Sequence, residues 1–507
     1  MAKLGKSFFA LKKNLTGFGK DTIFALQIKY QIMKKLYLIT LLLMAFAMTA
    51  TAQNKRMKIA KDDYLNSYLT VESLADNDTV KLRIPAELTA EDMTSVSYST
   101  DGDNWTTVLI DSTVHDITIV LNQGEKAYYK GLGKQVWADD IHNIHFSSTD
   151  SYIIYGNIMS LFYGDDFALH TEFPEGSEFS AGALWDYNHH LVSAEHLILP
   201  ATTIPYYGYW CMFYGCENLM AAPALPATNL SEGSYSYMFG GCSSLTVAPV
   251  LPATELANWC YDNMFEGCTS LTEAPALPAT TLAEGCYYGM FYECALTTAP
   301  ALPATTLVPG CYCFMFAYCT ALPAACEMHV TTVDRYSCYC MYYNCYALET
   351  ACELPATTMA SNCYGYMFAD CTALTEAPAL PATQLADSCY YTMFAGCVSL
   401  TAAPELPATT LTRNCYENMF YYCPSLIEAP ELPATTLADC CYRGMFGICT
   451  SLTKTPVLRA PVLTEECYSY MFEQCTEMHE LVCLATDISA EGCTSGWFLD
   501  GSTSGTF

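Results

Sequence analysis

One unit of about 26 residues repeats from about residue 199 to the end of the 507-residue chain. Each copy carries an aromatic residue three positions before a cysteine, in the pattern MFxxC, and successive aromatics lie 26 residues apart except for one step of 25. The aligned aromatics are Phe213, Phe239, Phe265, Phe291, Phe316, Tyr342, Phe368, Phe394, Phe420, Phe446, Phe472 and Phe498. We expect a degenerate earlier copy around Trp185. Because one such unit cannot bury its own apolar face, the repeat predicts a solenoid of about twelve stacked coils.

Each coil divides into two parts. In "CYxxMFxxC", Cys286, Met290 and Cys294 fall at i, i+4 and i+8, and Tyr287 and Phe291 form a neighbouring pair, so the segment predicts an apolar stripe on a short helical turn. The following segment, "SLTEAPALPATTL", suits a short strand and a turn, in which each proline removes one donor from the ladder. We therefore expect a β-rich α/β solenoid, with one strand and one short helical turn per coil. At about 4.8 Å per strand step, twelve coils would extend about 60 Å.

These residues resemble a known family. The stretch "MFEGCTSLTEAPALPATTLAEGCYYGMF" (Met264–Phe291) resembles the BspA-type leucine-rich repeat, and the likeness extends from about Met159 to the C-terminus. "GNIMSLFYGDDF" resembles the segment that leads into such arrays, and "CTSGWFLDGSTSGTF" resembles a closing cap that stops short, so we expect a truncated end. The resemblance implies a leucine-rich-repeat array in a secreted or surface-exposed binding protein, often one that adheres to host proteins or other cells.

The N-terminal region indicates export. Met33-Lys34-Lys35, the apolar run "LYLITLLLMAFAM" and Ala50-Thr51-Ala52 match the three parts of a signal peptide. The apolar run is too short to favour a membrane-spanning helix. We expect residues 1–32 to be an upstream extension from a start codon placed too early, residues 33–52 to be the signal peptide, and the mature chain to begin near Gln53. The expected location is extracellular or at the cell surface, with no transmembrane span in the mature chain.

Composition divides the remainder of the chain. Runs such as "SVSYSTDGDNWTTVLI" and "DITIVLNQ" alternate in polarity between Asp, Gly and Asn turns, which predicts a small β-sandwich over residues 53–157. "STDGDNW" is typical of a hairpin turn. We expect an N-terminal cap of the solenoid at 158–198, leucine-rich repeats at 199–488 and a C-terminal cap at 489–507.

The net charge of −30 belongs to the repeats. Through residue 159 the chain has 17 acidic and 17 basic residues, whereas from residue 160 onward it has 35 acidic and 5 basic residues. Such an acidic surface repels nucleic acid and anionic lipid, because it offers no basic patch that could displace counterions. We expect no nucleic-acid partner and a soluble monomer.

All 28 cysteines lie at or after Cys211. A spacing of eight residues and the scarcity of histidine disfavour zinc, and we expect no metal or cofactor. Disulfides between equivalent cysteines of neighbouring coils, such as Cys268 and Cys294, remain an alternative at strand spacing. Buried free thiols are favoured, because small residues replace the first cysteine in some coils. These residues are Gly208, Ser234 and Ser337, and the least explained cysteines are Cys313, Cys326, Cys340, Cys352 and Cys440.

The tetrapeptide LPAT occurs nine times and resembles a sortase signal, but none of its copies precedes an apolar tail and basic residues. We interpret it as a strand end followed by a proline turn. Asp139, Asp140, His142 and His145 are the densest titratable cluster, followed by Asp165-Asp166. A hydrolase could use such carboxylates, but acidic loops are common at domain junctions. We assign no catalytic residue and expect no enzyme.

Tyrosine is the residue type that points to function. On the predicted helical turn, positions two, three, six and seven after the first cysteine should face solvent, where tyrosine offers a large contact area with little entropy loss. The candidate ligand-facing residues are Tyr288, Tyr292, Tyr318, Tyr366, Tyr391, Tyr421, Tyr422 and Tyr470. Packing between adjacent coils is the alternative explanation for them.

The expected function is that of an exported, non-enzymatic leucine-rich-repeat protein that mediates protein–protein or cell-surface adhesion. Its expected partners are host extracellular or matrix proteins, other cells or glycans. One alternative is a carbohydrate-active enzyme or glycan-capture accessory protein, and another is a purely structural surface spacer.

Overall fold

A computed structural model describes residues 64–85, 92–111, 113, 115–134 and 144–498. The described residues belong to one compact unit, Tyr64–Phe507. The predicted signal peptide and the mature start near Gln53 therefore lie outside the described residues. Among the described residues, no helix has the length and apolar character needed to span a membrane.

The N-terminal part of the described chain contains two sheets that share one apolar core. The strands are β1 (Leu69–Ser73), β2 (Asp78–Ile84), β3 (Met93–Ser99), β4 (Thr106–Leu109), β5 (His115–Leu121), β6 (Lys126–Gly133), β7 (His145–Ser147), β8 (Tyr152–Asn157) and β9 (Leu191–Ile198). The larger sheet has the order β4-β3-β6-β1-β8-β9 and the smaller one β5-β2-β7. Along β5 the buried residues Ile117, Ile119 and Leu121 alternate with exposed ones, as expected for a sheet with one covered face.

The larger sheet continues into the array. After β8 the chain forms α4 (Ser160–Tyr163) and the short helix η1 (Gly164–Leu169), and it returns to the sheet as β9. β9 pairs in parallel with β8, and its Ser193 forms a parallel bridge with Ala221 of the next coil. The segment that we expected to be a separate cap, residues 158–198, thus supplies the last strand of the larger sheet. Its backbone groups give the first coil a ladder to pair with, which removes an exposed sheet edge.

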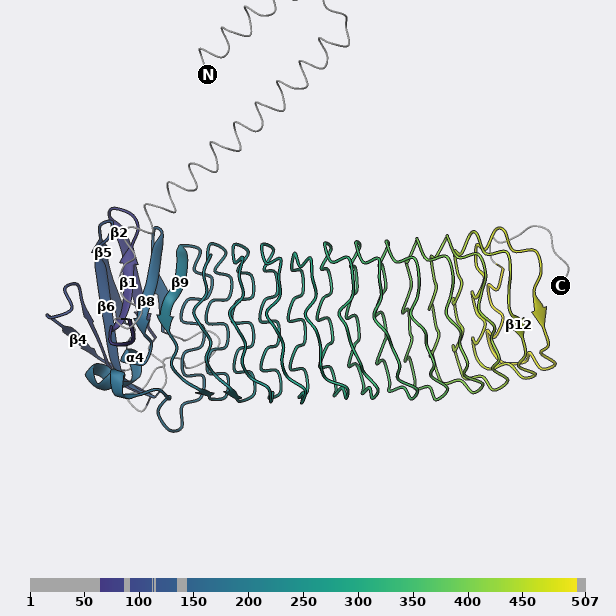
Figure 1. The fold of residues 1–507 in the computed structure, drawn as a ribbon, viewed down its shortest axis with the longest axis horizontal. Coiled ribbons are helices and arrows are strands. Elements are labelled where there is room, and N and C mark those ends of the chain that lie inside the picture. The colour runs from purple at the N-terminus through teal and green to yellow at the C-terminus, as the bar shows by residue number, and fades with distance from the viewer. Residues whose placement is uncertain (1–63, 86–91, 112, 114, 135–143, 499–507) are drawn as a thin grey trace, which may run out of the picture. The chain divides into compact units, whose positions relative to one another are not determined.

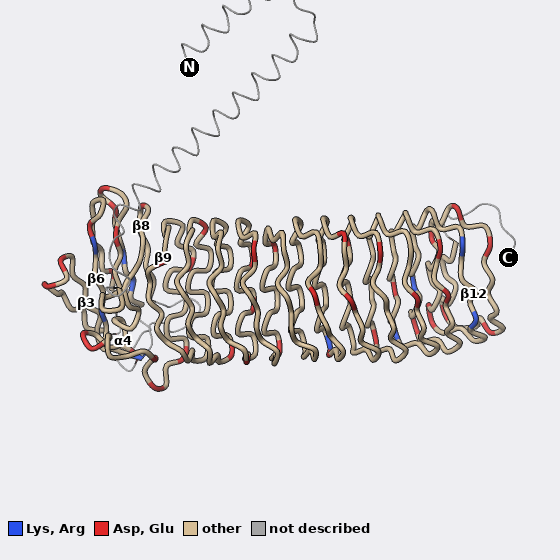
Figure 2. The backbone as a smooth tube through the Cα atoms, in the orientation of Figure 1, with Lys and Arg blue, Asp and Glu red and all other residues tan. Residues whose placement is uncertain are grey.

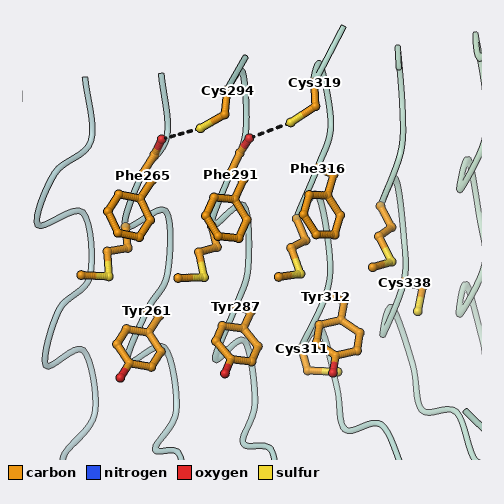
Figure 3. Packing of buried hydrophobic residues seen from close by; sticks show 14 of the residues in the cluster. Tyr261, Phe265, Tyr287, Phe291, Cys294, Cys311, Tyr312, Phe316, Cys319 and Cys338 are labelled. Carbon is orange, nitrogen blue, oxygen red and sulfur yellow. Dashed lines mark hydrogen bonds between the residues drawn. The ribbon is translucent and has the colours of Figure 1, made fainter. Parts of the chain in front are cut away.

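From residue 199 to 498 the coils stack along one axis (Figure 1). Two columns of aromatic rings run through the core of the stack (Figure 3). The first column contains the aligned aromatics of the repeat and extends back to Trp185 and Phe146, with successive ring centroids 5.3–6.3 Å apart. The second column follows the CY tyrosines, as in the pair Tyr261 and Tyr287 at 5.8 Å. Offset stacks at this spacing add to the free energy gained by burying the rings.

The predicted helical turn is wrong. Segment 259–268 is a run of consecutive β-turns whose backbone N–H groups alternate between two acceptors. Tyr261 N–H donates to the carbonyl of Cys286 in the next coil at 3.1 Å, whereas Asp262 N–H donates to Trp259 in its own coil at 3.2 Å. Every fourth residue has a positive φ, for example Trp259 at 55° and Asn263 at 48°. In an α-helix, every N–H group beyond the first turn bonds to a carbonyl group of the same helix. Here every second N–H group bonds to the next coil instead, so consecutive β-turns form in place of a helix.

The apolar stripe predicted for this segment nevertheless exists. Cys286, Met290, Phe291, Tyr287 and Cys294 are at most 2% exposed. They point inward because the turn run repeats every four residues, so positions i, i+4 and i+8 fall on one side as they would on a helix.

The opposite side of each coil is nearly extended but makes few ladder bonds. Isolated parallel bridges such as Glu376 with Ala402 and Glu428 with Lys454 link neighbouring coils. The short strands are β10 (Thr203–Ile204), β11 (Asn229–Leu230), β12 (Val457–Leu458) and β13 (Val482–Cys483), which form two parallel pairs. The prolines of each "APxLP" segment lack the N–H that a continuous ladder needs, so only isolated bridges form along most of this side.

The second cysteine of each coil has a specific role in the stack. Its Sγ donates to the carbonyl oxygen of the column aromatic in the preceding coil, as Cys294 does to Phe265 at 3.0 Å and Cys319 to Phe291 at 3.1 Å (Figure 3). The cysteines that make this contact, at 2.9–3.2 Å, are Cys216, Cys242, Cys268, Cys294, Cys319, Cys345, Cys371, Cys397, Cys423, Cys449 and Cys475. A thiol suits this position because it is a small apolar group with one weak donor.

All 28 cysteines lie among the described residues, and none of them forms a disulfide. All are buried except Cys211, Cys440 and Cys483, which are partly exposed. At the first cysteine position, Ser234 and Ser337 are fully buried, so this site holds small side chains of different polarity.

Candidate binding surface

The β-turn side of the array, here called the turn face, carries the candidate tyrosines. It consists of positions two, three, six and seven after the first cysteine position of each coil, together with the residue before that position. Two of the eight candidates, Tyr422 and Tyr470, are 50% and 36% exposed. The other six are half-buried, so the expected solvent exposure is only partial. Burial raises the pKa of Tyr288 and Tyr366 to about 12, so both hydroxyl groups stay protonated at neutral pH.

The structure brings several candidates together in one row. Rings contact from coil to coil along Trp259, Tyr288, Phe314, Tyr339, Tyr366 and Tyr391, with centroids 5.3–5.9 Å apart, and we call this row the aromatic belt. A branch runs through Tyr292, Tyr318 and Tyr343 and rejoins the belt at Tyr366. Tyr421, Tyr422 and Tyr470 are not members of this row or of its branch.

Sequence reasoning missed part of the belt. Tyr339 occupies position two and Phe314 position three of their coils, so alignment of the repeat could have found both. Trp259 precedes the first cysteine position, and the candidate positions were counted only from that cysteine onward, although even a helix would have placed residue 259 beside positions two and three, three and four residues later. The β-turn run places it there because residues four apart share the same positive-φ position.

Some aromatic rings of the turn face are half-buried because they lie against the next coil. Aromatic rings on the turn face lie over a glycine of the next coil, as Tyr339 does over Gly365, and Tyr421 over Gly447. A Cβ on Gly447 would stand 2.7 Å from the Tyr421 ring, a distance that would force the ring to move. Glycine in the following coil thus makes room for these two rings, whereas the equivalent residues after Tyr366 and Tyr391 are Thr392 and Glu417.

Many turn-face aromatics also have an unfavourable backbone conformation. Eleven aromatic residues have a positive φ, and four of them are candidates: Tyr318, Tyr366, Tyr422 and Tyr470, at 54–61°. In several other coils the same positions hold glycine or asparagine, the residues that tolerate this conformation best, and in others they hold residues such as Cys211, Thr392 or Ile448. The conformation costs a bulky side chain about 1 kcal/mol or more.

A depression of about 380 Å³ opens on the turn face near the C-terminal end of the array, and we call it the C-terminal depression. Its lining residues are Tyr366, Tyr391, Thr392, Ala395, Glu417, Asn418, Tyr421, Arg443, Gly444, Tyr470 and Glu473. Four of the eight candidate tyrosines therefore contribute to it. Its size lies within the range of small-ligand sites.

A second depression of about 350 Å³, the N-terminal depression, is more apolar. Trp259, Tyr288, Phe314, Tyr336 and Tyr339 provide its rings, and Glu284 and Arg335 lie among its other lining residues, with 3.9 Å between the guanidinium and the carboxylate. The aromatic belt connects the two depressions, because Tyr339 of this one contacts Tyr366 of the other at 5.7 Å.

Charge in the two depressions differs from charge on the rest of the array. Acidic residues recur along the coils with few basic ones among them (Figure 2). Two of the five basic residues after position 160, Arg335 and Arg443, line the depressions. Arg443 Nη1 lies 3.0 Å from Glu466 and 3.9 Å from Glu417. Burial raises the pKa of Glu417, an effect that Asn414 and Arg443 oppose.

The structure describes only part of the acidic clusters considered for catalysis. Asp139, Asp140 and His142 lie outside the described residues, and His145 Nδ1 contacts Asp186 at 2.9 Å. Asp165 accepts hydrogen bonds from Lys130 and Tyr68, which lower the pKa of its carboxyl group. This arrangement fastens η1 to β6 and to Tyr68 beside β1. Within the described part of the chain, no group of three or more His, Cys, Asp or Glu side chains is placed to hold a metal ion.

The LPAT tetrapeptides belong to the packed core on the side opposite the turn face. Leu277 and Ala279 are 4% and 1% exposed, while Pro278 between them is exposed. The leucine and alanine of each copy therefore point into the stack, as expected for a structural segment.

Comparison of the chain with protein-family models, curated proteins and solved structures found no match. The function proposed below therefore depends on the geometry of the turn face.

Proposed function

We propose that the chain is an exported, non-enzymatic binding protein of the BspA-type leucine-rich-repeat kind, which mediates adhesion through the turn face of its array. Its partners are ligands carried by matrix proteins, other cells or glycans. Binding uses many modest contacts along the coils, as extended solenoid surfaces allow.

The observation that supports this proposal most strongly is the set of aromatics at positive φ. Glycine or asparagine at those positions would stabilise the backbone, and other coils use them there. Tyr366 and Tyr470 carry large rings despite the conformational free energy that a positive φ costs, and both line the C-terminal depression. Backbone strain of this kind is a reason to propose a function for the side chains that carry it.

The test uses substitutions that the repeat itself contains. Asn263 and Asn418 occupy the positions equivalent to Tyr366 and Tyr470. We therefore expect Tyr366→Asn with Tyr470→Asn to leave the unfolding free energy within about 1 kcal/mol of the unsubstituted protein. Binding to immobilised matrix proteins, glycans and cells, measured at low and high salt, should fall at least about tenfold.

A matched control replaces two aromatics with positive φ near the start of the array, Tyr187→Asn with Tyr207→Asn, which lie outside both depressions. Because these two residues of the turn face lie outside the depressions, this variant should weaken binding much less than the first one. If the unsubstituted protein bound nothing on a broad panel, the adhesion proposal would be wrong and the structural-spacer alternative would replace it. Equal loss of binding in both variants would also refute the role of the C-terminal coils.

A further inference from the structure

The C-terminal depression combines ring walls with planar polar groups. Tyr366 and Tyr391 contact edge to face at 5.3 Å, and Tyr421 and Tyr470 line the same hollow. Between the rings lie the amide of Asn418, the carboxylate of Glu417 and the guanidinium of Arg443. The site is therefore neither a purely apolar cleft nor a purely charged one.

The polar groups of the hollow are set out in a fixed arrangement. Arg443 is held by Glu466 and Glu417, and Glu417 accepts a hydrogen bond from Asn414. Asn418 projects over Gly444 of the next coil, where no side chain competes for the space. These groups offer both donors and acceptors to a ligand, because the amide and the guanidinium donate while the amide oxygen and the carboxylate accept.

The charge of the array limits the class of ligand that the C-terminal depression can bind. The chain from residue 160 onward carries 35 acidic and 5 basic residues, so an anionic ligand would be repelled as it approached. A cationic side chain of a partner would meet the guanidinium of Arg443, with Glu417 and Glu466 already paired to it, so Glu473 alone of these carboxylates would remain as its counter-charge. A neutral ligand is not repelled by the acidic surface, and it needs no counter-charge in the depression.

We propose that the C-terminal depression binds a neutral oligosaccharide. A sugar ring has an apolar face formed by C–H groups, which suits the tyrosine rings, and hydroxyl groups at its edge, which both donate and accept hydrogen bonds. The hollow of about 380 Å³ is large enough for a small ligand of this kind. This inference rests on the proposed adhesive function and names its ligand class.

The experiment titrates the full chain with neutral glucan, mannan and galactan oligosaccharides by calorimetry, at low and high salt. Asn418→Tyr replaces the amide with a ring that fills the hollow and leaves the other lining residues in place. The fold offers a precedent, because Tyr470 has the same backbone position and lies over Gly496 as Asn418 lies over Gly444. We expect saturable binding of one of these sugars, insensitive to salt, that weakens at least about tenfold in this variant.

The control is Asn263→Tyr. Asn263 has the same positive φ and lies over Gly289 in the same way, but it does not line the C-terminal depression. It should leave the affinity unchanged. If Asn418→Tyr does not fold, Tyr391→Ser decides instead, because Ser469 occupies the equivalent position three coils later. This variant should weaken binding by a similar factor.

The outcomes separate the two proposals. Binding to matrix proteins or cells without binding to any neutral oligosaccharide would overturn this inference and leave the adhesive function standing. A preference for sulfated sugars or for basic peptides would likewise overturn it, as would equal loss of sugar binding in the Asn418 and Asn263 variants. Absence of binding to every ligand would refute both proposals.

Discussion

At the scale of single residues, the position of a side chain in the turn run determines whether it is buried or exposed. Cys294, at the end of one run, is 2% exposed, and its thiol bonds a carbonyl oxygen of the preceding coil. Tyr422, one residue before the equivalent cysteine of its own coil, is 50% exposed. Neighbours in sequence thus have different roles, because successive pairs of positions in the turn run face the core and the turn face in alternation.

Thiol reactivity checks this arrangement. We expect brief alkylation of the native protein at neutral pH to modify Cys483 and Cys211, which are partly exposed, and to spare the 25 buried cysteines. Cys440 should react slowly, since partial burial and the neighbouring Glu417 and Glu466 raise the pKa of its thiol, and faster as the pH rises. Peptide mass spectrometry identifies the modified residues. Rapid labelling of Cys294, or a disulfide between Cys268 and Cys294, would contradict the packing described above.

At the scale of one coil, an irregular repeat shows how substitutions compensate. The first aromatic column has tyrosine at only one position, Tyr342, and the same coil has Cys326 where the coil before it has Pro300. Cys326 N–H donates to the Tyr342 hydroxyl oxygen at 3.0 Å, and its Sγ lies 2.9 Å from the same atom. A proline would offer no N–H, so the hydroxyl group and the cysteine belong together.

A double-mutant cycle tests this pairing. Tyr342→Phe leaves a buried N–H without its partner, and Cys326→Pro leaves a buried hydroxyl group without its donor. Each should lower the free energy of unfolding by about 1–3 kcal/mol. Together they recreate the proline–phenylalanine combination of Pro300 and Phe316. The double variant should therefore regain most of the loss in denaturant titrations, whereas simple additivity would show that the two residues are independent.

At the scale of the whole described unit, stability is distributed along the stack. Each coil contacts the coils before and after it through the first aromatic column, the alternating N–H bonds and the thiol bonds, and through the second column except where Cys338 replaces its tyrosine. The N-terminal sheets close one end of the array, since β9 belongs both to the larger sheet and to the first coil. A stack of this kind should tolerate loss of a whole coil but not of part of one.

Deletion of residues 373–398 removes one 26-residue period and joins Thr372 to Ser399, which recreates the "CTSLT" found at Cys268–Thr272. We expect the protein to remain folded, with an m value reduced by only about one-twentieth. It should lose oligosaccharide binding, because Tyr391 leaves the C-terminal depression. Deletion of residues 386–398 alone breaks the register, and it should unfold the coils around the junction. Equal stability of the two variants, measured by circular dichroism in guanidinium, would contradict the stacked-coil arrangement.

Periodicity in the sequence was sufficient to predict which side chains point inward. Cys286, Met290 and Phe291 were predicted to share an apolar stripe, and all three are fully buried, because any backbone that repeats every four residues places them on one side. The turn sequence "STDGDNW" likewise predicted the connection between β3 and β4, where Asp101 accepts N–H groups of Asp103 and Asn104. These features depend on short-range chemistry that the sequence carries in full.

Features that depend on contact between coils are determined only by the tertiary structure. An isolated segment with the pattern of Cys286–Cys294 suits a helix, and only the carbonyl groups of the adjacent coil, 25 or 26 residues away, draw alternate N–H groups out of it. The same contacts set Trp259 and Phe314 beside Tyr288, and they bring Tyr391, Glu417 and Arg443 around one hollow. Sequence spacing indicates which residues belong to equivalent positions, but the pairing of coils determines which of them form a site.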